Sequence, residues 1–167
     1  FAGGKSRLAG IWASGYRQPK DAPQNAASPS VLTVEHGAQG GDELNRPMAG
    51  KNHGWPVISY GLNYDGSRIG EGQAKPGYEQ PLHFWDPSIA PSGLAVYSGQ
   101  MFAEWQGDLL VGALKFQLLS RLDRDASGAI LSEERYFASE FGRIRDIAVA
   151  PDGAILLLTD EDDGALI

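Results

Sequence analysis

The sequence predicts an all-β protein, a sandwich, barrel or propeller, from three observations. Its 167 residues include 22 glycines and 10 prolines, which are spread over the whole length rather than gathered in one linker. Short apolar runs lie between these turn-forming residues, and long amphipathic helix patterns are scarce. Many short strands joined by Gly and Pro turns are typical of all-β architectures.

Five apolar runs are expected to form strands, because each is short and is bounded by turn-forming residues. They are residues 31–35, 57–60, 94–97, 109–114 and 154–159. The stretch 102–122 is compatible with helix or strand, since its apolar pattern fits both. The polar stretches 21–30 and 65–79 are expected to be loops, and long loops in compact domains are often functional.

Composition excludes several classes of function. The excess of 21 acidic over 14 basic residues, a net charge of −7, argues against a general nucleic-acid binder. Cysteine is absent, which excludes disulfides and Cys-ligated metal sites. No apolar stretch approaches the length of a membrane span, and the first residues show no signal-peptide pattern. The sequence also lacks the G-x-S-x-G, P-loop and H-E-x-x-H motifs.

Arg143 and Arg145 lie two residues apart at the start of an apolar run. In a strand these side chains share one face, roughly 7 Å apart. At an effective dielectric constant near 20, their charges repel by about 2 kcal/mol. The offsetting anion is either a nearby acidic side chain, with Asp146 and the acids at 160–163 as candidates, or an anionic ligand held by both guanidinium groups. Spacing alone favours the nearby acids.

Two acidic stretches are candidate calcium sites. Residues 34–45 (VEHGAQGGDELN) combine acidic side chains with glycines, which let backbone carbonyls turn toward a cation. A polar, Gly-rich turn is the structural alternative there. Residues 123–134 fit the EF-hand loop template through Asp123, Asp125, Ser127, Gly128 and Glu134. An EF-hand also needs flanking helices, whereas the same residues between apolar runs are typical of a β-hairpin turn.

Six stretches occur in an order that resembles a known family. They are IWASGYRQP (11–19), VEHGAQGGDELN (34–45), GKNHGWP (50–56), EQPLHFWDPSIAPSG (79–93), WQGDLLVGALK (105–115) and GRIRDIAVAPDG (142–153). Together they resemble the C-terminal half of the PQQ-dependent soluble aldose sugar dehydrogenases, the glucose/sorbosone dehydrogenase family. The resemblance implies a six-bladed β-propeller. At about 40–50 residues per blade, this chain would supply three to four blades.

The resemblance also implies a set of cofactor residues. PQQ is flat and carries three carboxylates, so its site must present several cations. The family residues that contact it match Arg17, Gln18, His36, Trp85, Lys115, Arg143 and Arg145. For the arginine pair, the resemblance reverses the preference for nearby acids. Gln18 stands where the family has Asn.

Calcium is the second cofactor that the resemblance implies. The calcium beside PQQ would be held by the backbone carbonyls of Gly37 and Ala38. A structural calcium would use the carboxylate of Glu43 and the backbone carbonyl of His53, which replaces the usual Tyr. Under the same resemblance residues 123–134 become a strand-to-strand hairpin, so the EF-hand is expected to be a chance match.

The implied activity is oxidation of the anomeric hydroxyl of aldose sugars to the lactone, with PQQ as electron acceptor, in the periplasm or outside the cell. The family's general-base histidine lies in the N-terminal half, and His36, His53 and His83 do not match it. We therefore expect the N-terminal blades to be absent from this chain, which would be inactive alone. A second propeller half or self-association would then close the arc. The alternatives are a non-enzymatic propeller that binds ligands, and a calcium-binding protein using residues 123–134.

Overall fold

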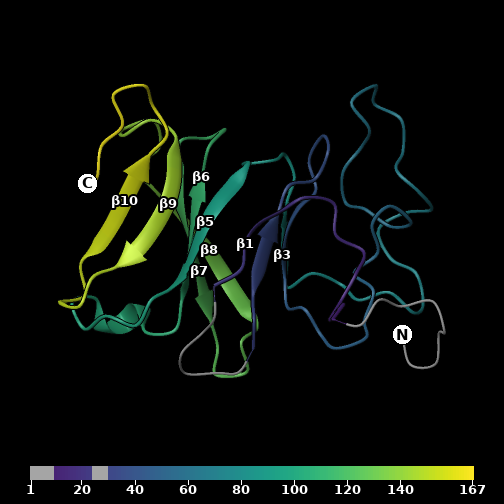
Figure 1. Ribbon diagram of the computed structural model, residues 1–167, viewed down its shortest axis with the longest axis horizontal. Coiled ribbons are helices and arrows are strands. Elements are labelled where there is room, and N and C mark those ends of the chain that lie inside the picture. The colour runs from purple at the N-terminus through teal and green to yellow at the C-terminus, as the bar shows by residue number, and fades with distance from the viewer. Residues whose placement is uncertain (1–9, 24–29) are drawn as a thin grey trace. The chain divides into compact units, whose positions relative to one another are not determined.

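The computed structural model describes residues 10–23 and 30–167 and divides the chain into two units, Phe1–Ser88 and Ile89–Ile167. In the first unit, four short strands form an antiparallel sheet in the order β1-β2-β3-β4 (Figure 1). Their bounds are Pro19–Asp21 (β1), Thr33–Glu35 (β2), Asp42–Asn45 (β3) and His83–Trp85 (β4). The expected loop at 21–30 lies partly outside the described residues, and 65–79 is a loop as expected.

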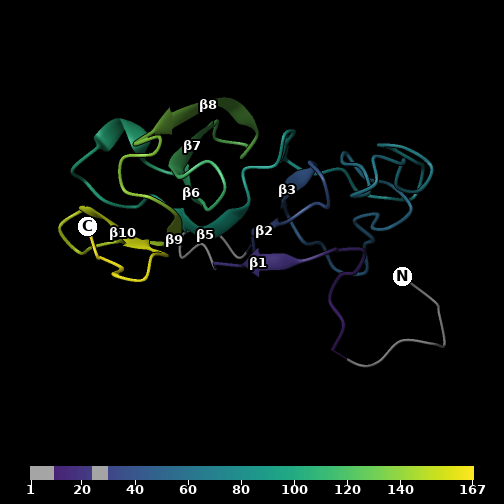
Figure 2. The same cartoon turned by 90° about the horizontal axis from the view of Figure 1, so that it is seen from above.

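The second unit is built from two antiparallel sheets. The first has the order β5-β6-β7-β8, and the second pairs β9 with β10. The strands are Pro91–Val96 (β5), Leu109–Ala113 (β6), Leu118–Arg124 (β7), Ile130–Tyr136 (β8), Ile144–Val149 (β9) and Ile155–Thr159 (β10). Strand β9 packs against β5 and β6 (Figure 2). One 3-10 helix, η1 (Ala103–Trp105), lies between β5 and β6.

Four of the five strand predictions are confirmed, and the fifth is wrong. The expected strand at 57–60 is a turn, because the backbone N–H groups of Val57 and Ile58 both donate to the carbonyl of Gly54. The side chain of Ile58 is nevertheless buried, which explains the apolar signal. The ambiguous stretch 102–122 contains η1, β6 and most of β7, so strand prevails over a long helix.

The core of the second unit lies between its two sheets. Its buried members are Tyr97, Leu110, Leu119, Ile144, Ile147 and Leu157. The Tyr97 hydroxyl donates to the carbonyl of Gly153 at 2.9 Å and accepts from the backbone N–H of Phe102 at 3.0 Å, so this buried polar group is satisfied. No helix in the described ranges is long and apolar enough to cross a membrane.

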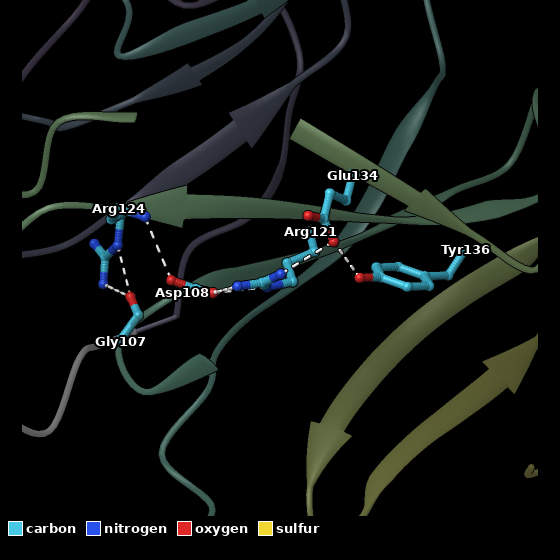
Figure 3. Close-up of polar contacts among 6 residues, drawn as sticks. All are labelled: Gly107, Asp108, Arg121, Arg124, Glu134 and Tyr136. Carbon is cyan, nitrogen blue, oxygen red and sulfur yellow. Dashed lines mark hydrogen bonds and ion pairs between the residues drawn. The ribbon is translucent and has the colours of Figure 1, made fainter. Parts of the chain in front are cut away.

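A buried ion pair joins the start of β6 to β7 (Figure 3). The Asp108 carboxylate is only 2% exposed and accepts from Arg121 Nη2 at 2.6 Å and Nε at 2.7 Å. The guanidinium of Arg121 lies over the ring of Trp105, with 4.7 Å to its centroid, and it also contacts Glu134 at 3.1 Å. The backbone N–H of Arg124 donates to Asp108 as well. A buried charge with several partners holds one local geometry.

Candidate cofactor site

Arg17, in the segment leading into β1, contacts the backbone at the end of β2. Its Nη1 donates to the carbonyl oxygen of His36 at 3.2 Å and to that of Gly37 at 2.7 Å. Its guanidinium carbon lies 5.5 Å from the ring centroid of Trp55 and 6.0 Å from that of Tyr64. Arg17 is therefore held between two aromatic rings and a pair of carbonyls.

The turn from β2 to β3 depends on Gly37. A Cβ atom at this position would lie 2.0 Å from the carbonyl oxygen of Gly40, so no other residue fits without moving the backbone. The backbone N–H of Gly37 donates to Asp42 Oδ1 at 2.9 Å, and Ser88 Oγ donates to Asp42 Oδ2 at 2.6 Å. The Gly37 carbonyl, which is expected to bind calcium, thus belongs to a tightly fixed turn. The neighbouring Ala38 is half-buried.

Glu35 and Glu43 face each other across β2 and β3 as Cα partners in the sheet register. Asn45 Nδ2 donates to both carboxylates at 3.0 Å. Burial raises the pKa of each to about 7. Two carboxylates directly opposite in a sheet repel one another. Such a pair fits a site where a cation compensates the charge.

The side chains around the carboxylate pair are also polar, and some of their buried polar atoms lack hydrogen-bond partners in the described chain. The ring of His53 is buried, its Nδ1 contacts Asn45 Oδ1 at 3.3 Å, and burial lowers its pKa. Tyr16 stacks on this ring, with centroids 4.8 Å apart. Within the described chain, His53 Nε2 and Tyr16 Oη are buried without a hydrogen-bond partner. A cavity of about 10 Å³ is lined by Glu35, Glu43, His53 and Gly37, among others, enough for about one water-sized guest.

These observations test the fit of calcium to this unit. Glu43 fits, because its half-buried carboxylate faces that of Glu35 and lines a cavity of suitable size. The Gly37 carbonyl already accepts from Arg17, but a carbonyl oxygen has two lone pairs and can accept a second partner. Sequence reasoning placed Glu35 in the candidate calcium stretch 34–45, but it missed the pairing of Glu35 with Glu43 and the role of Asn45. The hairpin register of 34–45 is the signal that would have found them, because it pairs Glu35 with Glu43.

Replacing Glu43 with Gln is expected to raise the free energy of unfolding by about 2 kcal/mol at pH 8 in calcium-free buffer. The amide keeps an oxygen for Asn45 and removes one of two buried charges. The gain should shrink toward pH 5. Folding raises the pKa of Glu43 from 4.5 to about 7, so ionisation opposes folding progressively as the pH rises from 4.5 to 7, and the whole cost is present above pH 7. Urea unfolding at both pH values measures this, and an equal effect at both contradicts it.

The other residues assigned to the first unit are less prominent in it. Gln18 is exposed, and its carbonyl accepts from the backbone N–H of the half-buried His36 at 3.1 Å. Trp85 is 2% exposed and meets the ring of His83 edge-on, with centroids 4.8 Å apart. Trp85 is thus packed inside the unit, and its assignment to PQQ stays a prediction.

In the second unit, Arg143, directly before β9, and Arg145, within β9, share one carboxylate. Arg143 Nη2 lies 3.0 Å from Asp160 Oδ2, and Arg145 Nη2 lies 2.7 Å from the same atom. Arg145 and then Arg143 lower the pKa of Asp160 by hydrogen bonding to its charged form. The arginine side chains are 42% and 45% exposed. A nearby acid is therefore present, as spacing alone favoured, but one negative charge faces two positive ones. The anionic ligand stays a prediction.

Lys115 is the third cation of the second unit that the resemblance assigns to PQQ. It follows β6, is exposed, and its Nζ lies 5.6 Å from the ring centroid of Phe116. No acid among the residues placed by the structure lies within ion-pair distance of Lys115. Because Arg17 belongs to the first unit and these three cations to the second, each group is described by itself. Their convergence on one ligand stays a prediction.

The EF-hand alternative at residues 123–134 is wrong. These residues are the end of β7, a turn and the first part of β8, so strands stand where an EF-hand needs helices. Asp125 Oδ1 accepts from the backbone N–H groups of Ser127 at 2.8 Å and Ala129 at 3.0 Å, which is an Asx-type turn. No cluster of three or more His, Asp or Glu suited to a metal ion occurs in the described part of the chain.

Comparisons with known proteins agree on one family. A family model described as Glucose / Sorbosone dehydrogenase matches residues 1–167. The chain is 40% identical over 165 residues to the aldose sugar dehydrogenase YliI of Escherichia coli (strain K12), covering 94% of this chain and 43% of that protein. It is 25% identical over 219 residues to quinoprotein glucose dehydrogenase B of Acinetobacter calcoaceticus, covering 93% of this chain and 45% of that protein.

Solved structures of glucose and aldose sugar dehydrogenases also match this chain. A crystal structure of a glucose dehydrogenase matches with a TM-score of 0.93 and 42% identity, over 99% of this chain and 48% of that one. The apo-form soluble aldose sugar dehydrogenase from Escherichia coli matches with a TM-score of 0.91 and 38% identity, over 99% of this chain and 48% of that one. The chain thus spans about half the length of the relatives it matches.

Proposed function

Because this chain belongs to the glucose/sorbosone dehydrogenase family, we propose that it forms part of a PQQ- and Ca²⁺-dependent aldose sugar dehydrogenase. The proposed reaction of the whole protein is oxidation of the anomeric hydroxyl of an aldose to the lactone. The all-β sheets and the close structural relatives support a propeller, and six blades are part of the proposal. We also propose that the protein works in the periplasm or outside the cell.

The observation that carries the proposal is the charge of the second unit's cation group. Arg143 and Arg145 have one carboxylate between them, and Lys115 has none. All three side chains are accessible. The two guanidinium groups and the Lys115 ammonium can therefore donate hydrogen bonds to a carboxylate that arrives from solvent. A flat ligand with three carboxylates matches this excess of positive charge. The name quinoprotein, carried by one relative, supports PQQ as that ligand.

The residues of this chain would divide the work as follows. Arg143, Arg145 and Lys115 would neutralise the carboxylates and orient the ring, and Arg17 would be a further cation for the cofactor. Gly37, Ala38 and Glu43 would hold calcium with hard oxygen ligands. When bound, PQQ would supply the two-electron acceptor and calcium would polarise its quinone oxygen.

Titrating the chain with PQQ tests the proposal. Absorbance and thermal unfolding are followed in three arms, PQQ alone, Ca²⁺ alone, and both together. Because a ligand at 100 times its dissociation constant stabilises the folded state by about 2.7 kcal/mol, the combined arm should give a clear shift that the single arms do not. A propeller that has lost this chemistry would show no shift in any arm, and that result contradicts the proposal.

A further inference from the structure

We propose that Tyr64 is the residue on which the sugar substrate stacks, an inference that rests on the proposed function and adds a residue to it. Tyr64 is 77% exposed, the most exposed of the large hydrophobic side chains in the described chain. Its hydroxyl accepts from Arg17 Nη2 at 3.3 Å, and its ring centroid lies 6.0 Å from the guanidinium carbon. An aromatic ring open to solvent and held beside a candidate cofactor residue is a ready binding surface.

The loop around Tyr64 is ordered by its own hydrogen bonds. The backbone N–H of Asn63 donates to the Ser67 carbonyl at 2.8 Å, and that of Ser67 donates to Asp65 Oδ1 at 2.8 Å. These bonds close a short hairpin-like turn with Tyr64 near its tip. A ring presented on such a turn loses little conformational entropy when a ligand binds to it.

The same turn is tied to the segment that carries the candidate calcium carbonyls. Leu62 and Gln39 exchange backbone hydrogen bonds of 2.9 and 3.0 Å, one in each direction. Gln39 follows Gly37 and Ala38 directly in the sequence. Tyr64, Arg17 and the β2–β3 turn therefore form one connected corner of the first unit.

Arg17 supplies polar donors beside the ring. Its Nη1 donates to two carbonyls, and Nη2 donates to Tyr64. The Nε–H and the second Nη2 hydrogen have no acceptor among the residues that the structure describes. A pyranose presents an apolar C–H face and a rim of hydroxyls, so it can lie on the tyrosine while a hydroxyl accepts from the arginine. Pyranoses with equatorial hydroxyls have the flattest such face and should be preferred.

Saturation-transfer NMR on the chain with D-glucose tests this assignment without requiring catalysis. Irradiation of the aromatic protons should saturate the C–H protons of the sugar in the wild type and in Tyr64→Phe, since both keep the ring. Tyr64→Ala should lose most of the transfer. Trp12→Ala, which removes another exposed aromatic (64%), should retain it. No transfer in the wild type, or equal transfer in the wild type and Tyr64→Ala, overturns the assignment.

Kinetics of the full-length protein loaded with PQQ and Ca²⁺ give a second readout. Tyr64→Ala should raise KM for the sugar about three- to tenfold, with a smaller effect on kcat, because the lost contact binds ground state and transition state alike. If PQQ binds and KM is unchanged, the inference about Tyr64 fails and the proposed function stands. If PQQ does not bind and Tyr64-dependent transfer from glucose persists, the proposed function fails and the sugar contact stands.

Discussion

Replacing Asp108 with Ala is expected to lower the free energy of unfolding by about 3 kcal/mol. The substitution leaves Arg121, whose side chain is only 11% exposed, without its closest anion. It also removes the acceptor for the backbone N–H of Arg124. Denaturant unfolding measures the loss, and the guanidinium charge left without its carboxylate is the physical cause.

The matched control is Glu134→Gln, which removes the other carboxylate that Arg121 contacts. The Glu134 side chain is 54% exposed, so the loss should be much smaller than for Asp108→Ala. Both substitutions remove one negative charge beside Arg121, one at a buried position and one at an exposed position. Equal losses would show that the Asp108 pair is no more important than an ordinary surface ion pair.

Replacing Arg145 with Ala is expected to weaken PQQ binding about 10- to 100-fold in the presence of Ca²⁺. This prediction rests on the proposed function. A charged hydrogen bond to a carboxylate is lost, and the remaining Arg143 is then balanced by Asp160 alone. Fluorescence or calorimetric titration at fixed ionic strength measures the change, because such contacts weaken as salt rises.

Arg135→Ala is the control for this experiment. Arg135 is a strand arginine of the same unit, its side chain is 41% exposed, and its Nε lies 2.9 Å from Glu133. It resembles Arg145 in exposure and in its pairing with a neighbouring carboxylate. PQQ affinity should be unchanged in Arg135→Ala. A similar loss in both variants would mean that PQQ responds to net charge rather than to the cation group around Asp160.

Strands of the second unit could be predicted from sequence because their apolar runs are complete. Residues 109–114 and 154–159 consist largely of buried or half-buried apolar side chains between turns, and β6 and β10 form there. Residues 57–60 carry the same pattern, yet they form a turn that begins at Gly54, and this turn is enough to bury the side chain of Ile58. A short apolar run indicates that its side chains are buried. It does not say whether the backbone is strand or turn, because that depends on which backbone groups form its hydrogen bonds.

Residues of the candidate site could be predicted only where they belong to a recognisable sequence motif. Arg143 and Arg145 stand out through their spacing, whereas their sharing of Asp160 depends on the pairing of β9 with β10. Glu35 was predicted as part of an acidic stretch, but its pairing with Glu43 was missed because cross-strand register is not visible in a linear reading. Tyr64 was missed because its contact with Arg17 joins residues 47 apart in the chain.

A crystal structure of the chain with PQQ and Ca²⁺ tests the central claim most directly, because it shows which side chains touch the cofactor's carboxylates. The account predicts that Lys115, Arg143 and Arg145 contact these groups. A structure in which both arginines remain on Asp160 alone, with the cofactor elsewhere or absent at saturating concentration, would contradict it.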